Sequence, residues 1–134
     1  YAARKRETDA SLQFLTRAFA DGEVDGMTVL PKPVQRPGPP IWVGGNAPAA
    51  LRRAVQFAHT WDAPYVDPDE LGAGIARLHE VCRAAGRDPS SISVSVRGFA
   101  AADVDPALLD RYADLGVVHV GVTLPVADLD RAVT

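Results

Sequence analysis

The sequence predicts an α/β fold built from parallel βα repeats. Four apolar segments of strand length lie near residues 41–44, 60–65, 92–97 and 117–123. Segments with a helical spacing of apolar residues separate them, and Gly, Pro or Asp mark most of the boundaries. Strands that alternate with helices form βαβ units, which require a parallel sheet with right-handed crossovers. The chain has 134 residues, 47% apolar and 23% charged, which suffices for one core, so we expect a single domain.

The beginning of the chain precedes these repeats. Residues 3–19 show helical spacing of apolar residues after a charged first turn, which predicts an amphipathic helix ending before Gly22. Residues 31–40 hold five of the 11 prolines, and proline lacks an N–H donor and has a fixed φ, so this segment is an extended connector. We therefore assign residues 1–40 to a leading helix and a Pro-rich connector, and residues 41–134 to four βα units.

Capping residues predict where three further helices begin. Each start combines an Asn or Asp N-cap with a proline in the first helical turn, since proline suits a position whose N–H has no partner. The three pairs are Asn46 with Pro48, Asp67 with Pro68, and Asp105 with Pro106. Gly86 and Gly116 end the second and third of these helices.

Two architectures fit repeated βα units, a doubly wound sheet and a segment of a (βα)8 barrel. The third strand places Ser93, Ser95 and Arg97 on one face, and the fourth places His119, Gly121 and Thr123 on one face. A doubly wound sheet favours apolar residues on both faces, whereas a barrel interior near its mouth accepts polar and small residues. This pattern favours the barrel. A complete barrel needs about 250 residues, so the chain is a single partial domain.

Charge and cysteine content exclude several classes of function. The formal net charge is −3 without long runs of either sign, so we expect no nucleic-acid partner. No apolar run approaches the roughly 18 residues of a transmembrane helix, so we expect no membrane association. Cys82 is the only cysteine, so we expect neither an intrachain disulfide nor a metal site, and we expect a cytoplasmic location. Because the chain opens on Tyr1 within a helical segment, we expect it to be part of a longer protein.

The turn after the first buried strand is the main candidate for chemistry. The strand ends in Gly44 and Gly45, which let a backbone approach a ligand closely. The N–H groups of Asn46, Ala47 and Ala49 then open a helix, whose N-terminus attracts anions such as phosphate. In the alternative interpretation the glycines serve only the turn. A valine at Gly45 is expected to block the ligand and keep the fold, provided that φ is negative there.

Arg97 is a second candidate ligand for an anion. It lies at the carboxyl end of its strand, where barrel enzymes place their active sites. A guanidinium can bind a phosphate or a substrate carboxylate, and a surface salt bridge is the alternative role. His119 lies on the polar face of the next strand, where a structural role is favoured over acid/base chemistry.

The chain resembles the C-terminal part of the bacterial luciferase-like monooxygenase family, especially branches that use coenzyme F-420. The resemblance rests on PKPVQRPGPPIWVGGNAPAALRRA, on Gly-Arg-Asp-Pro at residues 86–89 and on Leu-Gly-Val at residues 115–117. It covers nearly the whole chain. It implies the C-terminal half of a (βα)8 barrel that binds FMN or coenzyme F-420. Its phosphate loop corresponds to Gly44, Gly45, Asn46 and Ala47. Trp61 aligns with a Trp of the family and is a further coenzyme-binding residue that the resemblance implies.

The resemblance implies a flavin- or F-420-dependent oxidoreductase that passes hydride or electrons to an organic substrate or to oxygen. The residues for catalysis are implied to lie in four earlier βα units, so none is assigned here. Two alternatives are a non-catalytic flavin-binding or assembly protein and an inert remnant of a split gene. The expected partners are the coenzyme and an organic substrate. Because a cut barrel exposes two sheet edges, we also expect a homo-oligomer or association with an N-terminal half.

Overall fold

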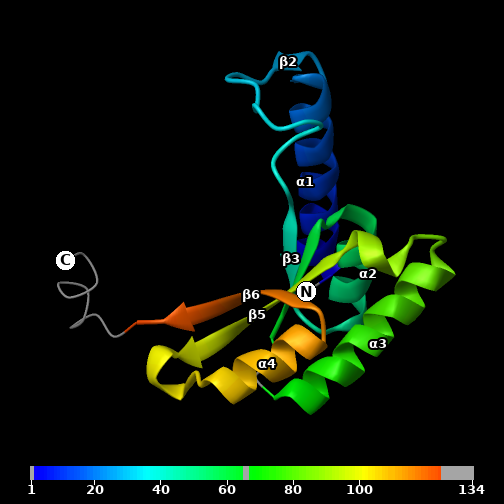
Figure 1. Cartoon of the computed structure of the whole chain (residues 1–134). Helices are drawn as coiled ribbons and strands as arrows, with labels where there is room; N and C mark the ends of the chain where they lie inside the picture. Colours follow the sequence, from blue (N-terminus) through cyan, green and yellow to red (C-terminus); the bar gives the residue numbers. More distant parts are fainter. Residues whose placement is uncertain (1, 65–66, 125–134) are drawn as a thin grey trace, which may run out of the picture.

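A four-stranded parallel sheet forms the centre of the computed structural model, which describes residues 2–64 and 67–124 (Figure 1). Its strands are β3 (Trp42–Gly44), β4 (Thr60–Ala63), β5 (Ser93–Ala100) and β6 (Val117–Thr123), paired in the order β3-β4-β5-β6. All three pairings are parallel, as predicted. A doubly wound sheet reverses its strand order at a switch point, whereas these strands follow one another in chain order as in a barrel.

Helices α2 (Pro48–Phe57), α3 (Pro68–Ala84) and α4 (Pro106–Asp114) follow β3, β4 and β5, respectively, and lie on one side of the sheet (Figure 1). Short 3-10 turns, η1 (Pro89–Ser91) and η2 (Ala101–Asp103), flank β5. The helix expected after the fourth strand and the end of the second predicted strand lie outside the described residues.

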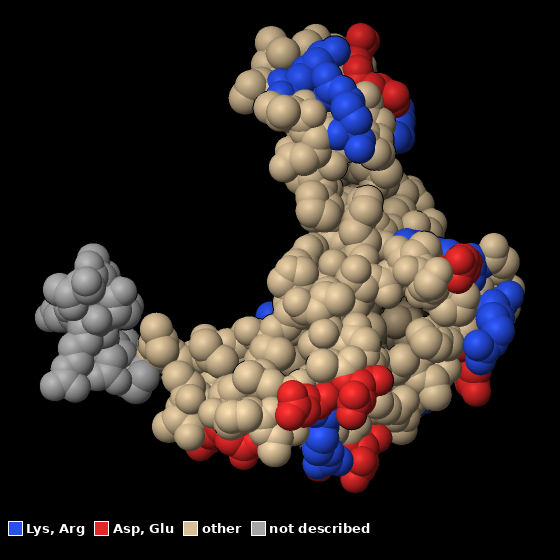
Figure 2. Space-filling view, in the orientation of Figure 1, with Lys and Arg blue, Asp and Glu red and all other residues tan. Residues whose placement is uncertain are grey.

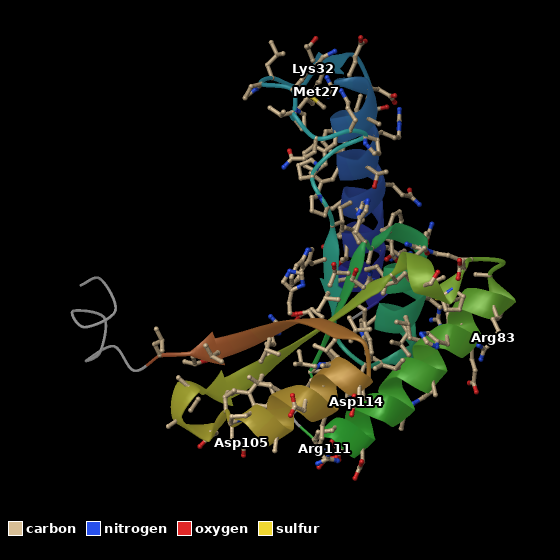
Figure 3. The ribbon with its side chains drawn as sticks, viewed as in Figure 1. Met27, Lys32, Arg83, Asp105, Arg111 and Asp114 are labelled. Atoms are coloured by element: carbon tan, nitrogen blue, oxygen red, sulfur yellow. The ribbon has the colours of Figure 1, made fainter. Side chains whose placement is uncertain are left out.

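Two of the three predicted N-caps are present. Asp67 accepts hydrogen bonds from the N–H groups of Asp69 and Glu70, at 2.8 and 3.1 Å. Asp105 accepts one from the N–H of Leu108, at 2.7 Å. Asp105 and Asp114 lie at the two ends of α4 in Figure 3, where Arg111 reaches toward α3.

The prediction that Asn46 caps α2 is wrong. The helix begins at Pro48, and its N-cap is Ala47, whose backbone is extended and whose side chain makes no capping bond. Proline at the first helical position disfavours helical geometry in the residue before it. The cap therefore falls on Ala47, which immediately precedes Pro48, and Asn46 lies one residue too early.

The core lies between the sheet and the three helices. Val43, Trp61 and Val96 from the sheet pack with buried residues of the helices, among them Leu71 and Leu78. Phe99 of β5 meets Tyr112 of α4 edge to face, with ring centroids 5.6 Å apart. Cys82 is fully buried in this core, and burial raises the pKa of its thiol.

The leading helix α1 (Ala2–Asp21) projects from the sheet as an arm (Figure 1). At its far end β1 (Glu23–Val24) and β2 (Met27–Thr28) form an antiparallel hairpin that was not predicted. The Asp25-Gly26 turn, with φ of 52° and 78°, is its sequence signal. The Pro-rich connector contains neither helix nor strand, as predicted. None of the helices described could cross a membrane, since none is both long and apolar enough.

Candidate functional site

The two faces of the sheet differ in chemistry. The register of the three strand pairings places four residues side by side on the face opposite the helices: Gly44, Asp62, Ser95 and His119. Trp42 of β3 and His119 of β6 also meet on this face, with ring centroids 5.0 Å apart. Adjacent strands lie about 4.8 Å apart, so a flat sheet would separate the backbones of β3 and β6 by roughly 14 Å. The sheet therefore curls around its polar face, as barrel strands do, and this face is called the concave face below.

The turn after β3, residues 44–47, is held by the neighbouring strand. Gly45 has a φ of +107°, which L side chains rarely adopt. Its N–H donates to the backbone oxygen of Asp62 at 3.3 Å, and its oxygen accepts from Trp61 Nε1 at 2.8 Å. Gly45→Val was expected to keep the fold only if φ is negative at this position. Because φ is positive, valine would strain this backbone and the condition is not met.

Trp61 supports the turn from inside the core. Its side chain has no exposed surface. Its indole N–H fixes the Gly45 carbonyl. The ring packs on the helix side of the sheet and its N–H reaches the turn, so coenzyme binding by Trp61 itself stays a prediction.

The start of α2 leaves backbone donors for a ligand. The oxygen of Ala47 accepts from the N–H groups of Ala50 and Leu51, at 2.8 and 3.1 Å. Among the described residues, the N–H groups of Asn46, Ala47 and Ala49 find no backbone acceptor. Such unpaired donors carry the positive partial charge of a helix N-terminus. Anion binding by Asn46 and Ala47 stays a prediction that this geometry permits.

Arg97 forms an ion pair whose partner the sequence did not predict. Its Nε lies 2.7 Å from Oδ2 of Asp62, whose side chain is only 12% exposed, whereas the Arg97 side chain is 61% exposed. The predicted salt bridge therefore exists, but its partner belongs to the concave face of the sheet. The guanidinium has further N–H groups on its terminal nitrogens that can bind a second oxyanion.

A shallow groove of about 530 Å³ lies beside this ion pair. Residues after β4, at the carboxyl half of β5 and at the end of β6 line it: Pro64, Arg97, Gly98, Gly121, Val122 and Thr123. In Figure 2 the hollow between the α1 arm and strands β5 and β6 is almost free of charged residues. Barrel enzymes bind their ligands at the carboxyl ends of the strands, which is where the groove and the 44–47 turn lie.

The motif at residues 86–89 lies at the opposite end of the sheet. Arg87 donates from Nη1 to the oxygen of Val55 and from Nη2 to that of Ala58, both at 2.7 Å, at the C-terminus of α2. Its Nε donates to Ser91 Oγ at 2.8 Å. His59 accepts from the Ile41 N–H through Nδ1 at 3.0 Å. These hydrogen bonds connect neighbouring loops at the amino end of the sheet.

Comparison with known proteins agrees with this geometry. A family model described as luciferase-like monooxygenase matches residues 2–127. The chain belongs to this family. Uncharacterized proteins of Mycobacterium bovis and Mycobacterium tuberculosis are 41% identical over 104 residues, covering 72% of this chain and 34% of theirs. The chain thus spans about a third of the length of these curated relatives.

Solved structures of family members share the fold at low sequence identity. An F420-dependent secondary alcohol dehydrogenase, solved with an F420-acetone adduct, aligns with a TM-score of 0.65 at 14% identity, over 93% of this chain and 58% of its own. DmoA from Hyphomicrobium sulfonivorans gives 0.55 at 15% identity, over 84% of this chain and 31% of its own. The coenzyme F420-dependent tetrahydromethanopterin reductase of Methanopyrus kandleri gives 0.52 at 15%, over 83% and 39%. The predicted parallel βα repeats of a (βα)8 barrel are confirmed.

Proposed function

We propose that this chain forms the phosphate-binding part of a flavin- or F-420-dependent oxidoreductase. One observation carries the proposal: the unpaired N–H groups at the start of α2 and the Arg97 guanidinium flank Gly44, at the carboxyl end of the sheet. Donors of this kind suit a phosphate, which both FMN and coenzyme F-420 carry. Two of the structurally similar enzymes are F420-dependent, which supports this class of coenzyme.

The chain's own residues would bind and orient the coenzyme. When bound, its ring would supply the chemistry, hydride or electron transfer to an organic substrate or to oxygen. The 44–47 turn would hold the phosphate through backbone N–H groups, and Arg97 would add a positive side chain. Trp61 keeps the turn in place through Gly45, so the phosphate position depends on the core.

We also propose that the concave face is covered in the functional assembly by further βα units. Trp42 on the concave face, and Val118 and Val122 on the edge strand β6, are 45–57% exposed. Open strand edges and exposed apolar side chains favour association. We therefore expect the chain alone to self-associate and to show no turnover. Light scattering that gives a stable monomer at micromolar concentration would contradict this expectation.

The test of the coenzyme proposal uses ligands that differ only in the phosphate. FMN and riboflavin are titrated into the chain and followed by fluorescence. One charge-assisted hydrogen bond contributes about 1.5–3 kcal/mol, so we expect FMN to bind at least about tenfold more tightly than riboflavin. Raising the ionic strength from about 0.01 M to 1 M should reduce that preference. Equal binding of the two flavins would contradict the proposal.

A further inference from the structure

The Arg97 side chain runs across the concave face between two glycines. At its base, a Cβ on Gly121 of β6 would lie 3.1 Å from the Cβ of Arg97. At its tip, a Cβ on Gly44 of β3 would lie 3.0 Å from Arg97 Nη2. Both distances are closer than ordinary contacts between side chains. The absence of a side chain at each glycine therefore provides the space in which the arginine lies extended.

Asp62 binds the middle of the Arg97 side chain. Its carboxylate oxygen Oδ2 lies 2.7 Å from Arg97 Nε and is largely shielded from water. The backbone oxygen of the same residue accepts the Gly45 N–H at 3.3 Å. One residue of β4 thus fixes both the arginine and the turn to which the arginine extends.

We propose that Asp62 is a positioning residue, which with Gly44 and Gly121 directs the Arg97 guanidinium to a phosphate bound at the 44–47 turn. This inference rests on the proposed function, since it assigns how that site acquires its side-chain cation. It also gives Gly44 a role different from the one expected: its missing Cβ makes room for Arg97 Nη2.

The sign of one substitution separates positioning from simple electrostatics. A carboxylate close to a bound anion repels it, so Asp62→Asn should strengthen phosphate binding if Asp62 contributes only its charge. If Asp62 positions Arg97, the same substitution frees the exposed arginine to adopt other rotamers, and phosphate binding weakens. Ordering a long side chain costs entropy, which the ion pair offsets before the ligand arrives.

The experiment measures FMN dissociation constants for the full chain and five variants. Asp62→Asn and Arg97→Gln should each weaken FMN binding about five- to tenfold, with riboflavin binding unchanged. The double variant should bind FMN no more weakly than Arg97→Gln, because Asp62 acts through Arg97. Gly44→Ala retains every charge and should weaken binding about threefold by displacing the flexible Nη2 end. Gly72→Ala is the matched control, since its Cβ would make only an ordinary 3.6 Å contact with Leu115.

Two outcomes of the FMN titrations overturn the inference in different ways. If the wild-type chain prefers FMN to riboflavin but Asp62→Asn binds FMN equally or more tightly, the positioning role is wrong and the proposed function stands. If the wild-type chain shows no such preference, the proposed function fails and the inference fails with it. The Arg97 Nε–H signal in nitrogen–proton NMR spectra checks the intermediate step, because this proton should exchange faster with water in Asp62→Asn. A folded Asp62→Asn chain with an unchanged Nε–H signal would also contradict the positioning role.

Discussion

The two ends of the parallel sheet use arginine in opposite ways. At the amino end, Arg87 donates to backbone oxygens of α2, Val55 and Ala58, and also to the Ser91 hydroxyl. At the carboxyl end, Arg97 has one carboxylate partner, Asp62, and remains 61% exposed beside a groove. Arg87 thus uses its N–H donors to stabilise the fold, whereas Arg97 retains N–H donors for a ligand.

This difference separates residues that stabilise the fold from residues that can bind. In (βα)8 proteins the loops at the amino ends of the strands serve stability, and those at the carboxyl ends carry the site. The Gly-Arg-Asp-Pro motif and the Gly44-Gly45 pair both belong to the set of motifs that carries the resemblance. The hydrogen-bond partners indicate that the Gly-Arg-Asp-Pro motif stabilises the fold, whereas the Gly44-Gly45 pair is left to bind the ligand.

The largest expected effect comes from removing the amino-end arginine. Arg87→Ala leaves several partly buried carbonyl groups without their donor, so we expect the free energy of unfolding to fall by about 2–4 kcal/mol. Urea denaturation measures this change. Arg83→Ala, at an exposed arginine in the last turn of α3 (Figure 3), is the control and should cost less than about 0.5 kcal/mol. A loss of FMN affinity in folded Arg87→Ala would break the distinction between the two ends.

A medium effect is expected from glycines with positive φ at the two ends. Gly45→Ala places a Cβ on a backbone with φ of +107° and 3.2 Å from the Cβ of Ala50, so we expect about 1–3 kcal/mol of destabilisation and weaker FMN binding. Gly86→Ala, with φ of +69° and open space around it, should cost about 1 kcal/mol and leave FMN binding unchanged. Thermal unfolding and FMN titration of both variants test the pair. Equal FMN affinities would show that the 44–47 turn is no ligand site.

The smallest effect is a pH dependence at the amino end. Hydrogen bonds from the N–H and hydroxyl of Ser90 lower the pKa of Asp88 below its ordinary value. A depressed folded-state pKa contributes stability that is present above the unfolded pKa and is lost as pH falls through the folded pKa. Asp88→Asn should therefore flatten the acid limb of the stability profile slightly, below about pH 4. An identical acid limb in urea midpoints of both proteins would contradict this role.

Much of the fold could be predicted from the sequence. Local signals located the strands and helices, because helix caps such as Asp67 and Asp105 act within a few residues. Asn46 failed as a cap because Pro48 moved the helix start, and the β1–β2 hairpin was missed although Asp25-Gly26 signals it.

The candidate site was only partly predictable. The 44–47 turn and Arg97 carry local signals, a glycine pair before a helix and a charge at the end of a strand. Asp62 was missed because its role depends on pairing between β4 and β5, whose register a single sequence does not specify. The fit of Arg97 between Gly44 and Gly121 joins strands from three parts of the chain, so only the folded structure can reveal it.

The most direct measurement of the central claim maps FMN binding on the chain by amide NMR. The account predicts that FMN, and not riboflavin, shifts the backbone signals of Asn46, Ala47 and Ala49 and the Nε–H signal of Arg97. The Nε–H signal of Arg87, at the amino end, should remain in place. Shifts that are largest at the amino end, or that are the same for riboflavin, would contradict a phosphate site at the carboxyl end of the sheet.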